Sequence, residues 1–205
     1  VTPIIYKQLL DVSKATNTEL RIYHTLDFNP TLKRELEIGG AKVNDSLNDI
    51  NQYFQIFEEL HRENYKISFL YLSAHGGYIS ETAPNDTFYG HFKKELRGYR
   101  RGDSLKLESF KKIFQICKDL SLLSIDCQVV LNSCYLGQTR FHNTPIEETT
   151  EISAGEHAAR ILENNIVLAA RNAINSGTFV QEIILDTKNN RLIFSGNIPG
   201  FDNRF

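Results

Sequence analysis

The hydrophobic positions of this chain concentrate in two short runs of the same design. Residues 67–76 (ISFLYLSAHG) end in an imidazole and a glycine, and residues 127–134 (CQVVLNSC) end in a thiol. Both runs are rich in β-branched or aromatic residues and stop at small residues. This pattern is typical of strands that are buried on both faces of a parallel sheet. We therefore expect two such strands, with His75 and Cys134 at their carboxyl ends.

Amphipathic patterns separate and flank these two runs. Apolar positions at three- and four-residue spacing predict helices over residues 3–16, 46–63, 108–120 and 155–163. Further strands are predicted over residues 20–28 and 166–171, and the turn residues 186–191 predict a hairpin between 181–185 and 192–195. Alternating strands and helices imply right-handed crossovers and a mainly parallel sheet with both faces covered. The expected fold class is α/β.

Two stretches interrupt this alternation. Residues 77–107 are rich in Gly and in basic residues, and they contain Pro84, so we expect an irregular insert there. Residues 135–154 have little apolar content and read as a long loop beside the thiol, and loops of this length are often functional. A length of 205 residues fits one domain that covers residues 1–205.

Composition narrows the possible partners. Hydrophobic residues make up 41% and charged residues 23% of the chain, and the net charge is 23 − 25 = −2, so nothing indicates nucleic acid or membrane as a partner. No signal peptide is visible at Val1, and the lack of Met suggests a processed protein or an excised domain. Three cysteines without regular spacing predict a reducing compartment such as the cytoplasm rather than a disulfide framework.

The residues at the two strand ends suggest nucleophilic catalysis by a thiol. In open α/β sheets, ligands bind at the carboxyl ends of the strands. There Cys134 can serve as a nucleophile and His75 as its base, while the Gly76 N–H can donate to a developing oxyanion. Each residue alone also has an ordinary interpretation: Cys134 as a small buried hydrophobe and His75 as a turn residue. The two together, after strands of the same pattern with a helix between them, favour the catalytic interpretation.

At this point the sequence resembles a family. The segment SAHG at 73–76 and the segment NSC at 132–134 are similar to the dyad signature of the caspase-like cysteine peptidases of clan CD, and the resemblance in element order spans about 20–195. It is nearest to CHAT domains and to the self-processing cysteine protease domains of bacterial toxins. The resemblance implies a three-layer α/β/α fold with a mainly parallel central sheet and a C-terminal β-hairpin. It also implies a polypeptide substrate, which is either the parent chain or a partner protein.

The same resemblance assigns the residues. It implies Cys134 as nucleophile, His75 as general acid and base, and the Gly76 N–H in the oxyanion hole. The caspase branch has Gln-Ala before the thiol where this chain has Asn132 and Ser133, which argues against a eukaryotic caspase. A third residue that would orient the imidazole is not evident.

Substrate preference is less well defined. In the family, the segment after the strand that follows the cysteine strand lines the substrate pocket, which here is residues 169–176 with Arg171 and Asn172; Ser133 is a further candidate. Arg171 can pair with an acidic substrate side chain or can be a solvated residue at a strand end. Asp103 and Asp126 are candidates for a basic side chain, but nothing in the sequence places them.

A basic cluster in residues 93–101 has two interpretations. It forms a solvated face, or it binds an inositol polyphosphate, because toxin-type members of the family are switched on by inositol hexakisphosphate. No other cofactor is expected. The toxin-type resemblance also allows a secreted bacterial effector that acts in a host cytosol. The oligomeric state does not follow from the sequence.

Other functional classes stay open. The spacing from Cys134 to Arg140 fits the Cys-x5-Arg loop of tyrosine phosphatases, in which the loop and the arginine hold a phosphate. Against it, Ser133 precedes the thiol and Phe141 follows the arginine, where that family has His and a hydroxyl residue. The histidines lack the close spacing of a zinc site, so no metal is expected. A catalytically inactive caspase-like binding module is a further alternative.

Overall fold

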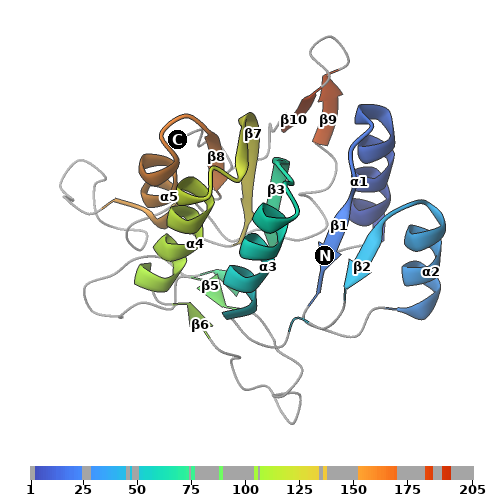
Figure 1. The fold of residues 1–205 in the computed structure, drawn as a ribbon, viewed down its shortest axis with the longest axis horizontal. Helices are drawn as coiled ribbons and strands as arrows, with labels where there is room; N and C mark the ends of the chain where they lie inside the picture. Colours follow the sequence, from blue (N-terminus) through green and yellow to red (C-terminus); the bar gives the residue numbers. More distant parts are fainter. Residues whose placement is uncertain are drawn as a thin grey trace, which may run out of the picture.

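The protein has mixed α/β architecture, with parallel strands in two small sheets (Figure 1). This arrangement comes from a computed structural model, which describes residues 3–24, 29–44, 47, 51–73, 75–76, 88–89, 104–105, 107–133, 136–137, 152–169, 183–186 and 191–194. The parallel pairing confirms the α/β class that the sequence predicts.

The larger parallel sheet has the order β3-β7-β8. It consists of β3 (Ile67–Ser73), β7 (Leu123–Asn132) and β8 (Ile166–Ala169), and both strand pairs are parallel. The central strand is fully buried from residue 127 to residue 132, so β7 has the two-sided burial that its apolar run predicts. β3 alternates instead between buried and more exposed residues, because successive side chains point to opposite faces and the face that carries Leu70 and Leu72 is the better covered one.

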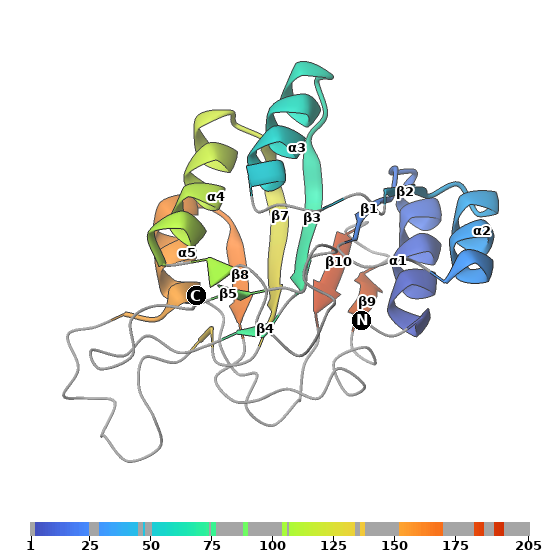
Figure 2. The same cartoon turned by 90° about the horizontal axis from the view of Figure 1, so that it is seen from below.

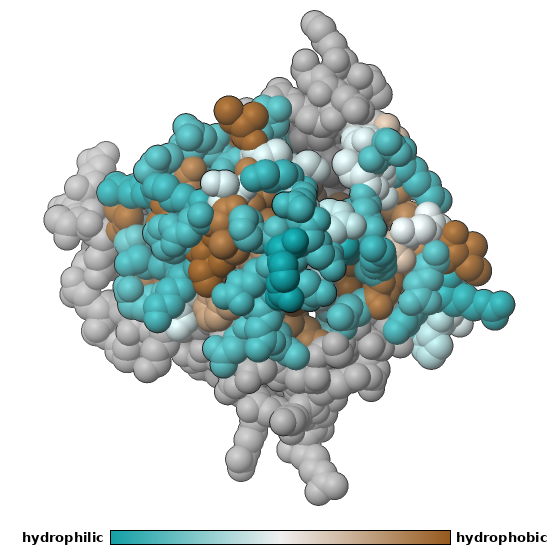
Figure 3. All heavy atoms as spheres, in the orientation of Figure 1, coloured by the Kyte–Doolittle hydropathy of each residue, from teal (hydrophilic) through white to brown (hydrophobic). Residues whose placement is uncertain are grey.

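Three helices cover one face of this sheet, and they lie in front of it in Figure 1. They are α3 (Asn51–Arg62), α4 (Leu107–Asp119) and α5 (Ala154–Leu162). Phe110 and Phe114 of α4 are fully buried, and their rings meet edge to face with centroids 5.0 Å apart. The apolar stripe of each helix faces the sheet, and the outward surface of these helices is mostly hydrophilic (Figure 3).

On the opposite face of the sheet, α1 (Pro3–Thr16) packs against β3. Leu70 and Leu72 belong to the core under the three helices, whereas Phe69 and Tyr71 point the opposite way and pack against α1. This division follows from the two-residue period of a strand. On β7 the same face carries Val130, which is also buried.

The second parallel sheet was not predicted in full. It pairs β1 (Arg21–Tyr23) with β2 (Lys42–Asn44), and α2 (Pro30–Ile38) lies between the two strands in sequence. The sequence analysis predicted only a loop there, so α2 and β2 are elements that it missed. Asn29 caps α2, since its side chain accepts hydrogen bonds from the N–H groups of Thr31 and Leu32. Seen from below, β1 and β2 lie on the β3 side of the larger sheet (Figure 2).

Short antiparallel pairs complete the described elements. β4 (His75–Gly76), β5 (Phe88–Tyr89) and β6 (Ser104–Leu105) form a small sheet directly after β3, and β9 (Ile183–Asp186) pairs with β10 (Arg191–Phe194). Most of the predicted insert at 77–107 and of the predicted loop at 135–154 lies outside the described residues.

The four helices predicted from the sequence are confirmed, with ends shifted by a few residues at most except at α3, which begins at Asn51 rather than at residue 46. Within the described ranges, no helix has the length and apolar character needed to cross a membrane.

The core makes a first prediction. Phe114 is 0% exposed, so Phe114→Ala removes a ring from the centre of the core and leaves a cavity. We expect the free energy of unfolding to fall by about 3–5 kcal/mol, measured by urea titration. Ile125→Ala is the control, because Ile125 is 81% exposed and should change the free energy by less than about 0.5 kcal/mol. Equal effects of the two substitutions would contradict the assignment of the core.

Candidate active site

The candidate site lies where β3 and β7 end. These strands are parallel neighbours, and their last residues, Ser73 and Asn132, are partners in the register. His75 follows Ser73 by two residues, and Cys134 follows Asn132 by two residues. The two chains therefore leave the sheet at the same level of adjacent strands. This is the rim at which open α/β sheets bind their ligands.

A local irregularity in β7 produces this register. Ile67 pairs with Leu123, an offset of 123 − 67 = 56, whereas Phe69 pairs with Gln128, an offset of 128 − 69 = 59. The three extra residues of β7 are accommodated in a bulge. Asn165 spans this bulge, since its Nδ2 donates to the carbonyl oxygens of Ser124 at 2.9 Å and Cys127 at 3.1 Å. Without the bulge, Ser73 and Asn132 would not be level.

Side chains join the two strand ends directly. Asn132 is buried, and its Nδ2 donates to the hydroxyl oxygen of Tyr71 at 2.5 Å and to that of Ser73 at 3.1 Å. Burial raises the pKa of Tyr71 well above its ordinary value, so the phenol stays neutral. The amide of Asn132 therefore acts as a clamp between the carboxyl ends of β3 and β7, immediately before the candidate dyad.

The chain is also fixed on both sides of Cys134. Ser133 is 1% exposed, and its N–H donates to the Leu131 carbonyl at 2.9 Å, which bends the chain at the strand end. Leu136 is fully buried in the core, and its carbonyl accepts a hydrogen bond of 2.8 Å from the N–H of Gly155 at the start of α5. The short segment that carries the thiol is thus anchored to β7 at one end and to α5 at the other.

The described part of the chain contains two other thiols, and neither suits catalysis. Cys117 and Cys127 are buried in the core, and desolvation raises the pKa of each to about 12. Because the thiolate is the nucleophilic form, both are unreactive near neutral pH.

Several sequence-predicted residues lie outside the described residues. They are Cys134, Arg171, Asn172, Asp103, Arg140 and the basic cluster in residues 93–101. The backbone of His75 and Gly76 forms β4, which pairs with β5 through Tyr89 and Phe88. Ser133, predicted near the substrate, is described and buried, and its hydroxyl oxygen has no hydrogen-bond partner. At 1% exposure, the Ser133 side chain is not accessible to a substrate in this structure.

The sequence did not single out the clamp. Tyr71 was assigned only to a strand, and Ser73 and Asn132 only to the strand ends and the dyad motifs, because a contact between side chains of two strands depends on the register. The available signal was an amide at the end of an otherwise apolar central strand, since buried polar side chains require hydrogen-bond partners.

No known protein-family model matches the chain, and no curated protein matches it either. The described residues contain no group of three or more His, Cys, Asp or Glu side chains that could hold a metal ion. The interpretation of the site therefore depends on the residues themselves.

Thiol reactivity makes a second prediction. At about pH 8, iodoacetamide should label the native protein once, at Cys134, because the two core thiols are buried and protonated. Mass spectrometry of intact protein should show one adduct before unfolding and three after it, in line with the three cysteines of the chain. Cys134→Ser should give no adduct in the native protein. Rapid labelling of Cys117 or Cys127 would contradict this view of the core.

The clamp makes a third prediction. Asn132→Ala should lower the free energy of unfolding by about 1–3 kcal/mol, because it removes the donor shared by Tyr71 and Ser73. Asn164→Ala is the matched control: Asn164 is exposed, and the change should cost less than about 0.5 kcal/mol in the same urea titration. Combining Asn132→Ala with Tyr71→Phe should cost less than the sum of the two single changes. Full additivity would show that the two residues do not interact.

Proposed function

We propose that this protein is a caspase-like cysteine endopeptidase in which Cys134 and His75 form the catalytic dyad. The observation that carries the proposal is the pairing of Ser73 with Asn132 in adjacent parallel strands, because each candidate residue follows one of these partners by two positions. Neighbouring strands lie about 4.8 Å apart, so chains that leave the sheet at the same level begin within reach of a Cys–His hydrogen bond.

The remaining thiols support the same choice. Cys117 and Cys127 are held protonated by burial, which leaves Cys134 as the candidate nucleophile of the chain. The order β3-β7-β8, with helices α3, α4 and α5 on one face and α1 against β3 on the other, is compatible with the proposed three-layer caspase-like fold. The antiparallel pairing of β9 with β10 is compatible with the proposed C-terminal hairpin.

In the proposed reaction, the Cys134 sulfur attacks the carbonyl carbon of a peptide bond and its proton passes to His75. The carbonyl electrons move onto oxygen, and the N–H of Gly76 donates to that oxygen. When the tetrahedral intermediate collapses, His75 gives the proton to the departing amine, and a thioester remains. Water, deprotonated by His75, then hydrolyses the thioester and restores the free thiol.

Substrate selection is part of the proposal. Arg171 and Asn172 follow β8 by two and three residues in the sequence, and Ala169 at the end of β8 pairs with Leu131 of β7. We propose that the arginine selects an acidic side chain before the cut bond. The basic residues 93–101 are proposed as a site where an inositol polyphosphate promotes activity.

Cleavage of a complex peptide library, read by mass spectrometry, tests the dyad. Cys134→Ala and His75→Ala should each reduce cleavage by roughly 10³-fold or more, because the two residues act as one unit. The matched controls are Cys117→Ala, a thiol in the core, and His61→Ala, an exposed imidazole on α3; both should keep nearly full activity. Each assay should be run with and without inositol hexakisphosphate.

Two results would count against the peptidase. Cleavage that survives Cys134→Ala would exclude the thiol as nucleophile. Phosphate release from a phosphotyrosine peptide that depends on both Cys134 and Arg140, without any peptide cleavage, would instead assign the site to the phosphatase class.

A further inference from the structure

The two hydrogen bonds of the Asn132 amide reach side chains of different kinds. Tyr71 is held independently of Asn132, because its ring packs against α1 and stacks on Phe69, with the ring centroids 6.5 Å apart. Ser73, in contrast, is exposed and is the last residue of β3. The bond of 3.1 Å from Asn132 Nδ2 to Ser73 Oγ therefore acts on an exposed side chain at the very end of the strand.

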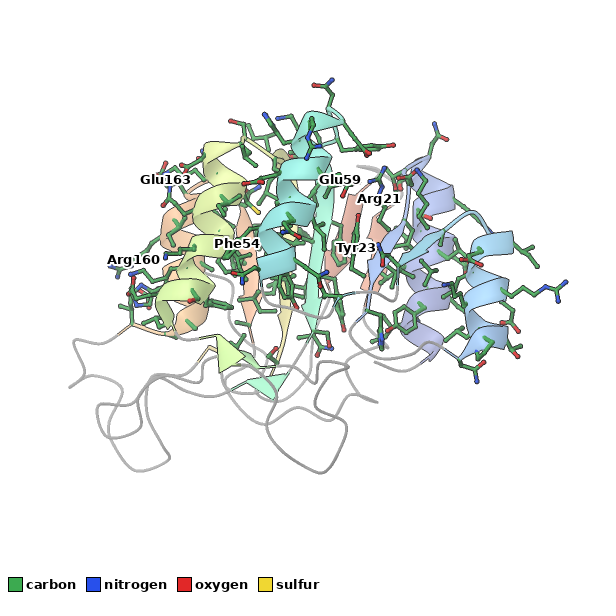
Figure 4. All side chains as sticks on the ribbon, turned by 60° about the horizontal axis from the view of Figure 1, so that its bottom comes forward. Arg21, Tyr23, Phe54, Glu59, Arg160 and Glu163 are labelled. Atoms are coloured by element: carbon green, nitrogen blue, oxygen red, sulfur yellow. The ribbon has the colours of Figure 1, made fainter. Side chains whose placement is uncertain are left out.

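Ser73 is also the position at which the pairing of β3 with β7 ends. It lies opposite Asn132 in the register, and the next strand along the chain, β4, pairs with β5 instead. In Figure 4, β3 and β7 end at the edge of the sheet opposite to Glu59 of α3 and Glu163 after α5. From Ser73 to His75 the chain spans two residues, or about 7 Å. A displacement of Ser73 would therefore be passed on to the main chain of His75.

The end of β7 is fixed more firmly than the end of β3. Asn132 is 5% exposed, the N–H of Ser133 donates to the Leu131 carbonyl at 2.9 Å, and Leu136 is fully buried. These contacts hold the chain on both sides of Cys134. The Asn132 amide thus joins a fixed strand end, which leads to the thiol, to an exposed strand end, which leads to the imidazole.

We propose that Ser73 is a positioning residue for the reaction of Cys134. Its hydroxyl oxygen accepts the hydrogen bond from Asn132 and keeps the end of β3 level with the end of β7, which sets the place from which His75 reaches the thiol. Ser73 acts through His75, without contact with the substrate. Small displacements matter here, because a reaction between two positioned groups slows steeply when one of them moves. This inference rests on the proposed dyad.

Alkylation of Cys134 by iodoacetamide tests the inference without a peptidase assay. An imidazolium beside a thiol keeps the reactive thiolate populated below the pH range of a free thiol, so the native protein should react at about pH 6. Ser73→Ala should slow this reaction by about tenfold, because displacement of the imidazole lowers the thiolate fraction. His75→Ala should slow it at least as much. Cys117 and Cys127 do not contribute, since both are buried.

Three further variants separate a positioning role from a loss of structure. Ser73→Thr keeps the hydroxyl at an exposed position and should restore the native rate of alkylation. Ser68→Ala is the matched control, because Ser68 is an exposed serine near the other end of β3, and it should leave the rate unchanged. Tyr71→Phe removes the other bond of the amide, farther from His75, so it should slow alkylation less than Ser73→Ala does.

Stability and turnover give two independent readouts. Because Ser73 is exposed, Ser73→Ala should move the midpoint of urea unfolding by less than about 0.3 M. In the peptide cleavage assay, the same variant should lower kcat by about tenfold and leave KM unchanged, since the contacts with the substrate are not altered.

The outcomes distinguish this inference from the peptidase itself. If His75→Ala slows alkylation at about pH 6 and Ser73→Ala does not, the dyad stands and Ser73 has no positioning role. A slower reaction of Ser73→Ala that Ser68→Ala shares, or that comes with a large fall in the urea midpoint, would assign Ser73 a structural role only. If His75→Ala leaves alkylation unchanged, no Cys–His pair exists, and the proposed function fails together with this inference.

Discussion

The burial of residues 127–132 of β7 is the constraint on which the rest of the structure depends. A strand without an exposed residue between positions 127 and 132 needs partners on both edges and cover on both faces. β3 and β8 supply the edges, and the helices α3, α4 and α5 cover one face with their aromatic and aliphatic side chains. Each apolar side chain buried here contributes about 1.5–3 kcal/mol. Burial thus fixes the position of β7 between its neighbours, while the bulge in β7 sets the level at which β3 and β7 end.

Local sequence patterns predicted those elements whose burial is strong and continuous. The run at 127–134 and the stripes of α3, α4 and α5 each encode their own environment, so they were identified without knowledge of the fold. α2 was not predicted from the sequence, because it is short and polar and only Leu36 in it is buried. Asn29 and Pro30 were interpreted as the end of a strand, although Asn at a cap and Pro at the first helical position also begin a helix.

The candidate site, too, could be predicted from the sequence in part only. That His75 and Cys134 follow neighbouring strands could be predicted, because strand order follows from alternation and handedness. The exact pairing of Ser73 with Asn132 could not, since it depends on the bulge in β7 that Asn165 spans. A bulge shifts the register by adding residues to one strand, and these residues have no recognisable sequence pattern. The hydrogen bond between Asn132 and Tyr71 depends on this register, so it could not be predicted from the sequence either.

The same constraints hold the main chain on both sides of the candidate site. The segment with the thiol can be short only if both of its ends are held, and Ser133 and Leu136 are held by β7 and by the core under α5. The imidazole follows a strand that Asn132 ties to the same edge. Movement of one strand end would carry its neighbour along, so Ser73 and Asn132, which the proposed dyad follows in the sequence, stay level with each other. A reaction that needs two groups within a hydrogen bond of each other is best placed where the main chain, rather than long side chains, sets the distance.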